Sequence, residues 1–373
     1  MRVIIAAAGT GGHINPAIAI ANKIKEREPN SKIIFIGTPR GLENDLVPRA
    51  GYNLKTIDVY GIRRKINLDN LKRIYKSVKA IGKVKKIIDD FKPDVVIGTG
   101  GYICVAVGLA AKAKKVPIIL HESNAFPGVA VKLLAKDSKK VLLGFEEAKE
   151  RMSKGANTVV TGTPTKITNT RLTEEQIMQI KNNLHLDSKL PIVLVFGGSQ
   201  GAQAINNAIV GIIENKLNKN YQILWAAGKK NYEDIKEELA RKNISIDMIE
   251  NAKIMPYIYN MQEAMEISDL IVARSGAMTI TEITQIGRPA IFIPYPFAAE
   301  NHQEYNARVL EKAGAAEIIL NKDLQFDNLN QEIENIVMDK SKVKQMGLNS
   351  KKIAKLNVEE KIYQEIKSAL KEY

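Results

Sequence analysis

The 373-residue sequence has one cysteine, and it has no apolar run of the roughly 18 residues that a membrane-spanning helix needs. The single cysteine, Cys104, excludes an internal disulfide and is typical of a protein from a reducing, cytoplasmic compartment. The chain starts on an apolar, strand-like segment without a basic leader or cleavage site, so we expect no signal peptide. These absences favour a protein without membrane spans or disulfides.

Several motifs that would indicate particular chemistry are also missing. There is no G-K-[ST] of a phosphate-binding P-loop, no D-x-D pair for a metal clamp, and no C-x-x-C, H-x-x-H or H-E-x-x-H for zinc. The first glycine turn, 9–12, lacks the full G-x-G-x-x-G spacing, and no acidic residue ends the apolar run 33–36 to hold a ribose. We therefore expect no metal ion and no nicotinamide, flavin or other cofactor.

Charge is distributed unevenly along the chain, whose net charge is +14. Residues 1–163 contain 29 Lys and Arg against 14 Asp and Glu, whereas residues 164–373 contain 26 against 27. The length and the 45% hydrophobic content fit a globular protein of two domains. The excess positive charge therefore belongs to the first half.

Within that half, residues 63–86 carry ten basic side chains and one acidic one, Asp69. Apolar residues recur between them at helical spacing, which predicts a basic amphipathic helix. Such a helix favours packing of the apolar stripe on the sheet together with binding to an anionic membrane surface; the alternative is that the stripe packs and the lysines are merely solvated. No nucleic acid is expected, because no recognition motif or aromatic stacking platform accompanies the charge.

Short Val- and Ile-rich runs alternate with longer helical stretches through the whole chain. Runs of this kind without polar alternation predict strands buried on both faces, and hence parallel sheets covered by helices. The expected strands are 3–8, 33–36, 54–57, 94–97, 116–120, 140–143 and 158–160 in the first half, and 192–196, 223–225, 271–273, 290–293 and 316–319 in the second. The fold class is thus α/β, with two Rossmann-like, doubly wound parallel-sheet domains facing across a cleft.

The turn-rich segment 161–166 predicts the linker between the domains. We expect an N-terminal domain over 1–163 and a C-terminal domain over 164–348. The helical end of the chain, about 349–373, could pack back on the first domain.

Three glycine turns follow predicted strands, at 9–12, 98–101 and 197–201. Glycines let the backbone approach a ligand closely, and the N–H groups of a following helix point at negative charge. The three turns therefore predict a site for a large ligand that carries a diphosphate.

Two polar groups accompany the turns in the first half. His13 ends the first turn and could act as a general base or merely contact a ligand phosphate. Residues 121–124 (His-Glu-Ser-Asn) follow another predicted strand, so we expect their side chains to face the same cleft.

In the second half, residues 274–282 follow a strand and begin a helix. The helix N-terminus could hold a diphosphate, and Glu282 could accept hydrogen bonds from two ribose hydroxyls. The polar stretch 300–307 is suited to binding a sugar and its amide group.

Six motifs together make a specific resemblance: GTGGH (9–13), GTGGY (98–102), HESNAFPG (121–128), GGSQGA (197–202), RSGAMTITE (274–282) and NHQEYNA (301–307). In this order they resemble, along nearly the whole chain, one bacterial glycosyltransferase family. Its members transfer N-acetylglucosamine from UDP-N-acetylglucosamine to the C4 hydroxyl of undecaprenyl-diphosphate-linked N-acetylmuramoyl-pentapeptide in peptidoglycan synthesis. The resemblance implies a glycosyltransferase-B fold and an inverting hexosyltransferase at the cytoplasmic face of the cell membrane, bound peripherally.

The resemblance also implies roles for individual residues. His13 is similar to the family's proposed base, and the glycine turn approaches the donor and the acceptor diphosphate. The substrate-binding positions it implies are Thr10, Gly11, Gly12, Asn124, Lys166, Ser199, Ile258, Ala277, Met278, Thr279, Glu282 and Gln303. Asn124 and Gln303 would lie near the donor sugar, Ser199 at the donor diphosphate, and the backbone of Ile258 at the uracil.

The sequence departs from the family pattern in two places. The usual G-N-P-x-R reads Gly162-Thr163-Pro164-Thr165-Lys166, so a lysine would replace a bidentate arginine. The usual pair of glutamines reads His302-Gln303, which leaves the division of roles there open. Two alternatives with the same fold also stay open, a diacylglycerol glycosyltransferase and a UDP-N-acetylglucosamine 2-epimerase.

Overall fold

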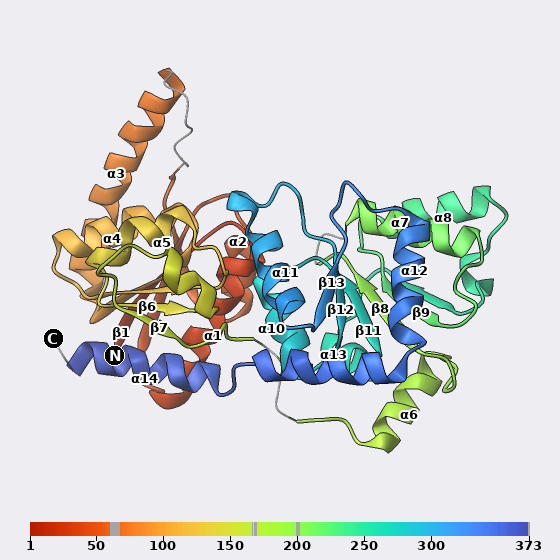
Figure 1. Cartoon of the computed structure of the whole chain (residues 1–373). Coiled ribbons are helices and arrows are strands. Elements are labelled where there is room, and N and C mark those ends of the chain that lie inside the picture. The colour runs from red at the N-terminus through yellow and green to blue at the C-terminus, as the bar shows by residue number, and fades with distance from the viewer. Residues whose placement is uncertain (60–67, 166, 168–169, 199–201, 372–373) are drawn as a thin grey trace. The chain divides into compact units, whose positions relative to one another are not determined.

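A computed structural model describes residues 1–59, 68–165, 167, 170–198 and 202–371, with only the backbone described for 68–78 and 247. The chain forms two compact units of α/β architecture (Figure 1). Unit 1 consists of Met1–Lys166 together with Lys355–Tyr373, and unit 2 consists of Ile167–Ala354. The chain therefore leaves unit 1 once and returns to it at its end.

Unit 1 contains a seven-stranded sheet in the order β3-β2-β1-β4-β5-β6-β7, with every neighbouring pair parallel. Its strands are short and rich in Val and Ile, and most of their side chains are buried, which confirms the prediction of strands covered on both faces. The strands are β1 (Arg2–Ala7), β2 (Lys32–Gly37), β3 (Asn53–Thr56), β4 (Val95–Gly100), β5 (Ile118–Glu122), β6 (Lys140–Leu143) and β7 (Thr158–Val160).

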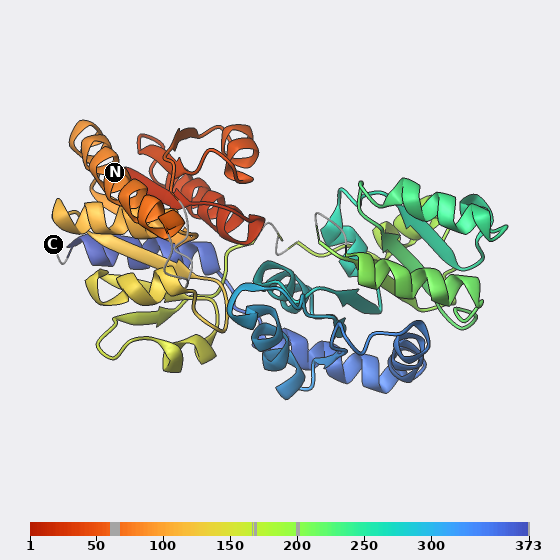
Figure 2. The ribbon, with the colours of Figure 1, turned by 90° about the horizontal axis from the view of Figure 1, so that it is seen from above.

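Helices cover both faces of this sheet. One face packs on α1 (Gly11–Arg27), α2 (Glu43–Arg49) and the C-terminal helix α14 (Val358–Lys371). The other face packs on α3 (Leu68–Phe91), α4 (Ile103–Ala113) and α5 (Val129–Leu134), which in Figure 2 lie over the strands. Two 3-10 turns, η1 (Ala135–Asp137) and η2 (Glu146–Arg151), complete the unit.

Helix α14 packs on unit 1 through one apolar stripe. Val358, Ile362, Ile366 and Ala369 recur at spacings of four, four and three residues, so they share one face of the helix. All four are buried in the apolar cluster that contains residues of α1 and of the sheet, and α14 contacts α1 and β6. Thr161 and Thr163, in the segment expected to be a linker, are also buried in unit 1. The C-terminal helix is thus a structural part of the N-terminal unit.

Unit 2 contains a six-stranded parallel sheet in the order β10-β9-β8-β11-β12-β13. Its strands are β8 (Ile192–Phe196), β9 (Gln222–Ala226), β10 (Ala252–Met255), β11 (Leu270–Ala273), β12 (Ala290–Phe292) and β13 (Ala316–Ile318). Its helices and 3-10 turns are α6 (Glu174–Asn183), α7 (Gln203–Glu214), α8 (Tyr232–Arg241), η3 (Ile246–Met248), α9 (Met261–Ile267), α10 (Ala277–Ile286), η4 (Ala299–Asn301), α11 (His302–Lys312), α12 (Phe326–Val337) and α13 (Lys340–Ile353). The expected pair of doubly wound parallel sheets is confirmed.

The edge strand β10 is not among the strands predicted from the sequence. Only Ile254 of its four residues is buried, and Lys253 interrupts the apolar run, so the segment lacks the continuous Val/Ile signal of the other strands. Its parallel pairing with β9 identifies it as a strand.

Candidate functional site

The sheet of unit 1 reverses its strand order between β1 and β4, and in such sheets ligands bind beyond the carboxyl ends of the strands at this point. The glycine turn 9–12 follows β1, Gly100 ends β4 beside it, and Gly101 follows. Two of the three predicted glycine turns therefore meet at one switch point.

The first turn is shaped for an approaching anion. Gly9 has a φ of +96°, in the region that favours glycine, and Thr10 is the extended N-cap of α1. The helix then begins at Gly11, and the N–H groups at the start of a helix lack the acceptors that later residues have, which suits them to an anion. Gly12 is exposed and His13 is half-buried.

The imidazole of His13 is held in a defined tautomer. Its Nδ1 lies 3.1 Å from the carbonyl oxygen of Ala8, which can only accept a hydrogen bond. In the neutral ring Nδ1 therefore carries the hydrogen, and Nε2 is left with the basic lone pair. The ring lies against Gly100, where any side chain would overlap it, and Thr99 Oγ1 donates to the His13 carbonyl at 2.8 Å.

The predicted cluster 121–124 divides into buried and accessible parts, contrary to the expectation that all four side chains face the ligand. His121 is fully buried and lies 3.1 Å from the carbonyl oxygen of Gly162, and burial lowers its pKa to about 4. Glu122 is buried as well and accepts from the Asn124 backbone and side-chain amides at 2.9 and 3.0 Å. The expectation fails because β5 extends through His121 and Glu122, and only Asn124 is half-exposed beyond it.

The sheet of unit 2 has an equivalent switch point between β8 and β11. Gly197 and Gly198 follow β8, and Gly198 has a φ of +87°. Residues 274–276 follow β11 and lead into α10, whose N-cap is Gly276. Along that helix Ala277 is buried, whereas the remaining predicted binding positions are partly exposed: Met278, Thr279 and Glu282.

A hydrogen-bonded network joins the start of α10 to the start of α11. Ser275, fully buried, donates through its hydroxyl to the Gln303 carbonyl at 2.8 Å, and Asn306 donates to the Ser275 carbonyl at 3.3 Å. The side-chain oxygen of Gln303 accepts from the Tyr295 backbone N–H at 2.9 Å. The network places Gln303 beside the N-terminus of α10.

Arg274 lies next to this network; it begins the motif 274–282, but the sequence suggested no role for its side chain. Its guanidinium donates to the carbonyls of Ile293 and Pro294 at 2.8 and 3.1 Å and lies 5.7 Å from the ring centroid of Tyr295. Burial lowers its pKa. The motif contains this arginine, but its bonds to the loop after β12 join residues about 20 positions apart and cannot be read from the motif.

Ile258 follows the edge strand β10, and its side chain is buried. The tyrosines on either side are accessible, with Tyr259 83% exposed, and their rings meet edge to face at 4.9 Å. The ammonium of Lys229 lies 5.2 and 5.5 Å from the two ring centroids. Ile258 thus lies buried between two accessible tyrosines at the end of β10.

The structure distributes the predicted positions over both units. Thr10, Gly11, Gly12, His13 and Asn124 belong to unit 1. The positions in unit 2 are Ile258, Ala277, Met278, Thr279, Glu282 and Gln303. Lys166 and Ser199 lie outside the described residues.

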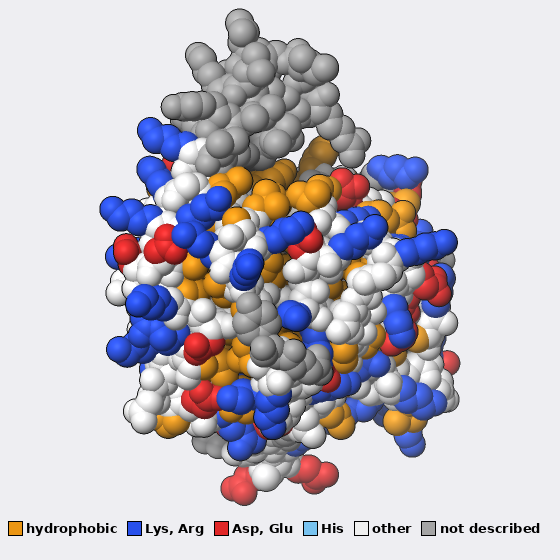
Figure 3. All heavy atoms as spheres, turned by 90° about the vertical axis from the view of Figure 1, so that its left-hand side faces the viewer, with side chains coloured by type: hydrophobic (Ala, Val, Ile, Leu, Met, Phe, Trp, Pro, Cys, Tyr) orange, Lys and Arg blue, Asp and Glu red, His pale blue; other side chains and the backbone are white. Residues whose placement is uncertain are grey.

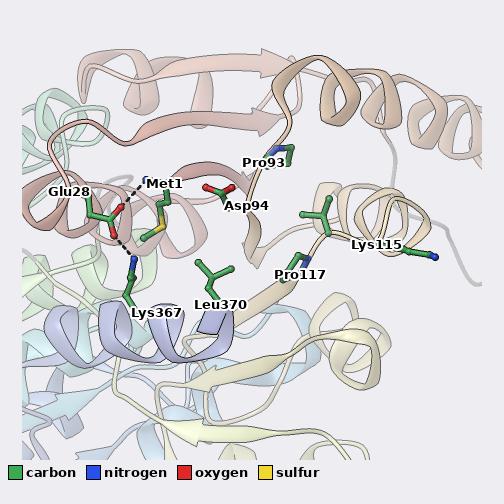
Figure 4. A pocket seen from close by; sticks show the side chains of 9 residues that line it. Met1, Glu28, Pro93, Asp94, Lys115, Pro117, Lys367 and Leu370 are labelled. Atoms are coloured by element: carbon green, nitrogen blue, oxygen red, sulfur yellow. Dashed lines mark hydrogen bonds and ion pairs between the residues drawn. The ribbon is translucent and has the colours of Figure 1, made fainter. Parts of the chain in front are cut away.

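A pocket of about 580 Å³ lies at the opposite end of the unit 1 sheet, where β1, β4 and β5 begin (Figure 4). Glu28 lines it and bonds to the Met1 ammonium and to Lys367 of α14, each at 2.8 Å. Burial alone would raise the pKa of Glu28, but hydrogen bonds from Lys367, the N-terminal ammonium and Tyr363 outweigh it and lower the pKa to about 2. These contacts attach α14 to the sheet, away from the glycine turns.

The described parts of the chain lack two further features. Within them, no helix is long and apolar enough to cross a bilayer. In the same residues, no group of three or more His, Cys, Asp and Glu side chains could hold a metal ion.

Comparison with known proteins gives matches over both units. Residues 3–143 match the glycosyltransferase family 28 N-terminal domain, and residues 192–363 match the glycosyltransferase family 28 C-terminal domain. A Thermoanaerobacter sp. (strain X514) protein named UDP-N-acetylglucosamine–N-acetylmuramyl-(pentapeptide) pyrophosphoryl-undecaprenol N-acetylglucosamine transferase is 45% identical over 99% of this chain and 100% of its own length.

Solved structures agree on the fold. The crystal structure of Acinetobacter baumannii MurG matches with a TM-score of 0.78 and 27% identity, over 98% of this chain and 99% of that one. A UDP-GlcNAc 2-epimerase from Neisseria meningitidis bound to UDP-GlcNAc matches with a TM-score of 0.65 at 14% identity, over 99% of this chain and 100% of that one. The latter likeness shows only a shared fold.

The identity of 45% with a named relative, over essentially the full length of both chains, shows that this chain belongs to the family of UDP-N-acetylglucosamine–N-acetylmuramyl-(pentapeptide) pyrophosphoryl-undecaprenol N-acetylglucosamine transferases, within glycosyltransferase family 28.

Proposed function

We propose that this chain is an inverting hexosyltransferase that transfers N-acetylglucosamine from UDP-N-acetylglucosamine to undecaprenyl-diphosphate-linked N-acetylmuramoyl-pentapeptide in peptidoglycan synthesis. The full-length identity with transferases named for this reaction carries the proposal. The epimerase alternative has only fold likeness behind it, at 14% identity. No observation favours a diacylglycerol acceptor.

The chemistry starts at His13. Its Nε2 would take the proton of the acceptor C4 hydroxyl while that oxygen attacks the anomeric carbon of the donor sugar. The bond from the anomeric carbon to the diphosphate oxygen breaks as the new glycosidic bond forms, and UDP leaves with its electron pair. A single displacement of this kind inverts the anomeric configuration. The Nδ1–H bond to Ala8 supports this role, because it leaves Nε2 unprotonated in the neutral ring.

Unit 1 would hold the acceptor. We propose that Thr10, Gly11 and Gly12 approach the acceptor diphosphate with backbone N–H groups at the start of α1. Asn124, held by Glu122 through its backbone and side-chain amides, would contact the donor sugar.

Unit 2 would hold the donor. The N-terminus of α10, with Ala277, Met278 and Thr279, would stabilise the leaving diphosphate, and Glu282 would accept from the ribose hydroxyls. Ile258 would read the uracil through its backbone, and Gln303 would contact the sugar. Ser199 and Lys166 are proposed to contribute a hydroxyl and a positive charge at the diphosphate.

A His13→Ala variant tests the base. We expect kcat to fall by about 10²- to 10⁴-fold, with UDP affinity retained because unit 2 is unchanged. The matched control is His185→Asn, an exposed histidine of unit 2 with a left-handed backbone that asparagine tolerates, which should keep full turnover. A His13→Ala enzyme with most of its turnover would refute the assignment.

Product analysis tests the reaction itself. Labelled UDP-N-acetylglucosamine is supplied with a polyprenyl-diphosphate-linked muramoyl acceptor, with diacylglycerol, or without any acceptor. We expect label in the first product only. Label in diacylglycerol, or epimerised donor without acceptor, would establish one of the two alternatives instead.

We further propose that unit 1 binds the anionic cytoplasmic face of the membrane peripherally. The described end of α3 packs Ala80, Val84 and Ile88 into the core, while Lys79 and Lys83 are exposed. Figure 3, which views unit 1 from the left-hand side of Figure 1, shows many lysine and arginine side chains among hydrophobic ones, with fewer aspartates and glutamates between them.

Helix α5 adds accessible apolar side chains to the same unit. Val129 and Leu133 are one turn apart and are 61% and 58% exposed, and Lys136 beside them is exposed as well. Apolar side chains flanked by lysines suit the boundary between lipid headgroups and acyl chains.

Flotation with anionic vesicles tests this surface. Reversing Lys72, Lys76, Lys79 and Lys83 to Glu should abolish flotation. The control reverses four lysines of unit 2, at 219, 236, 340 and 344, which changes the net charge equally and should leave flotation intact. Equal flotation of both variants would contradict a specific membrane surface on unit 1.

A further inference from the structure

The peptide group between Ala8 and Gly9 is hydrogen-bonded at both ends to ionisable side chains. Its carbonyl oxygen, on Ala8, lies 3.1 Å from His13 Nδ1. Its N–H, on Gly9, donates to Glu43 Oε2 at 3.0 Å. Because the C=O and N–H of a trans peptide point in opposite directions, Glu43 and His13 lie on opposite sides of one planar group.

The carboxylate of Glu43 lies in an unusual environment. It is fully buried (0% exposed) at the start of the short helix α2. Its other oxygen, Oε1, accepts from the Thr38 backbone N–H at 2.8 Å and from the Thr38 hydroxyl at 2.7 Å. Burial alone would raise the pKa of Glu43, but the hydrogen bonds from Thr38 and Gly9 outweigh it and lower the pKa, so the side chain is ionised at neutral pH.

The intervening peptide is fixed on its remaining sides. The Gly9 carbonyl accepts from the Leu42 backbone N–H at 3.2 Å. A Cβ at Gly101, which has a φ of +85°, would lie only 2.7 Å from the Ala8 carbonyl oxygen. The first contact holds the next peptide, Gly9–Thr10, and the second shows how closely Gly101 packs on the Ala8 carbonyl.

We propose that Glu43 is a positioning residue for His13, acting through the Ala8–Gly9 peptide as a carboxylate–peptide–imidazole chain. The inference rests on the proposed function, in which His13 is the base. The negative charge of Glu43 polarises the peptide, so the Ala8 carbonyl becomes a stronger acceptor for Nδ1–H. This fixes the tautomer that exposes the Nε2 lone pair, and it stabilises the imidazolium that forms when His13 takes the acceptor proton.

This carboxylate–peptide–imidazole chain orients His13 as a directly bonded aspartate or glutamate orients the catalytic histidine in other enzymes. Cys104 is another titratable group bonded at this strand end; it donates to the carbonyls of Ala6 and Gly100 at 3.2 and 3.0 Å. Burial raises the pKa of Cys104 to about 12, so it stays a neutral thiol and does not substitute for Glu43.

The wild-type protein gives the first test, free of any folding defect. Long-range ¹H–¹⁵N NMR of the imidazole should show the hydrogen on Nδ1 of neutral His13. The Gly9 amide proton should lie downfield and should move when Glu43 is protonated at acid pH. A neutral His13 that carries its hydrogen on Nε2 would overturn the proposal.

The second test is a double-mutant cycle with Glu43→Gln and His13→Ala. In the wild-type background Glu43→Gln should lower kcat by about 10- to 100-fold, the range seen when partners that orient functional histidines are removed, with the KM for UDP-N-acetylglucosamine unchanged. The acid limb of the kcat/KM profile and the NMR titration of His13 should both move to lower pH, since the imidazolium loses its stabilising charge. In the His13→Ala background the same substitution should change kcat by less than about twofold.

Thr38→Val is the matched control, because it removes one hydrogen bond to Oε1 and leaves the Gly9 bond to Oε2. It should leave the His13 titration unchanged and kcat within about threefold of wild type. A Glu43→Gln effect of equal size with and without His13, or an unchanged His13 titration, would refute the inference alone. Full turnover of His13→Ala would instead refute the proposed base.

Discussion

The hydroxyl of Ser275 donates a 2.8 Å hydrogen bond to the main-chain carbonyl of Gln303, so the residue before the N-cap of α10 is bonded to the first turn of α11. Ser275 is fully buried, and Asn306 donates back to its carbonyl at 3.3 Å. The two segments proposed to hold the donor diphosphate and the donor sugar are therefore fixed to each other inside unit 2.

A Ser275→Ala variant should bind the donor less well. Loss of the hydroxyl leaves the Gln303 carbonyl without this buried partner. The hydrogen bond that holds the two segments together contributes about 0.5–1.5 kcal/mol, and this is lost. We expect the KM for UDP-N-acetylglucosamine to rise about 2- to 10-fold, with a smaller change in kcat, measured by steady-state kinetics.

Ser350→Ala provides the control. Ser350 is equally buried in unit 2, but its hydroxyl has no hydrogen-bond partner among the described residues. Its removal should leave the KM unchanged, and an equal rise in both variants would mean that buried serines of this unit act only through stability.

Glu282 provides a ligand-level prediction. Replacing it with Gln should weaken UDP binding by about 10- to 100-fold, because hydrogen bonds to a charged acceptor contribute about 1.5–3 kcal/mol. Calorimetry with UDP and with its 2′,3′-dideoxy analogue checks whether the weaker binding comes from lost hydrogen bonds to the ribose hydroxyls. Wild type should prefer UDP strongly, and the Glu282→Gln variant should bind both compounds with similar affinity.

The control is Glu237→Gln on the exposed surface of α8, which should not alter UDP affinity. If the Glu282→Gln variant still discriminated fully against the dideoxy compound, another group would be reading the ribose.

The fold could be predicted from the sequence because its signals are local. Continuous Val/Ile runs such as 192–196 bury both strand faces, and glycines such as Gly9 occupy positions whose positive φ other residues avoid. The edge strand β10 lacked that signal, because only one of its side chains is buried.

The support of the site could not be predicted, because it depends on contacts between distant segments. Glu43 looks like a surface residue of a short polar helix, yet it is buried against the turn at Gly9, 34 residues earlier. His121 looked accessible, but its ring is bonded to Gly162, which lies 41 residues further along the chain. Local periodicity contains no information about such pairings.

His121 predicts a pH dependence of stability. Its pKa is about 4 when folded and near 6.5 when unfolded, so between these values the unfolded chain binds more protons. The stability of unit 1 should be full above pH 6.5 and fall as the pH is lowered towards 4, by up to about 1.4 kcal/mol per pH unit from this group. His121→Gln, which cannot titrate, should flatten that slope in hydrogen exchange of peptides from β5 and β6.

The same samples contain an internal control. The single tryptophan, Trp225, is buried in unit 2, so its fluorescence reports the unfolding of unit 2 and not of unit 1. Its unfolding curve should be unaffected by the His121 substitution. An unchanged slope for the β5 and β6 peptides would show that His121 is protonated in the folded protein.

Glu28 should stabilise the attachment of α14. Glu28 is an acid and His121 is a base, but both contributions to stability are lost as the pH falls. Its pKa is lowered to about 2 in the folded protein, so its contribution is complete above about pH 4.5 and is lost as the pH falls towards 2. At pH 7, Glu28→Gln should destabilise unit 1 by about 1–3 kcal/mol and increase hydrogen exchange in α14, since Lys367 and Tyr363 lose their shared partner.

Glu26→Gln is the control, because Glu26 is exposed and pairs only with nearby Lys23 among the described residues, so its loss should cost less than about 0.5 kcal/mol. The difference between the two variants should disappear near pH 2, and a difference that persisted there would mean that Glu28 acts through packing instead of charge.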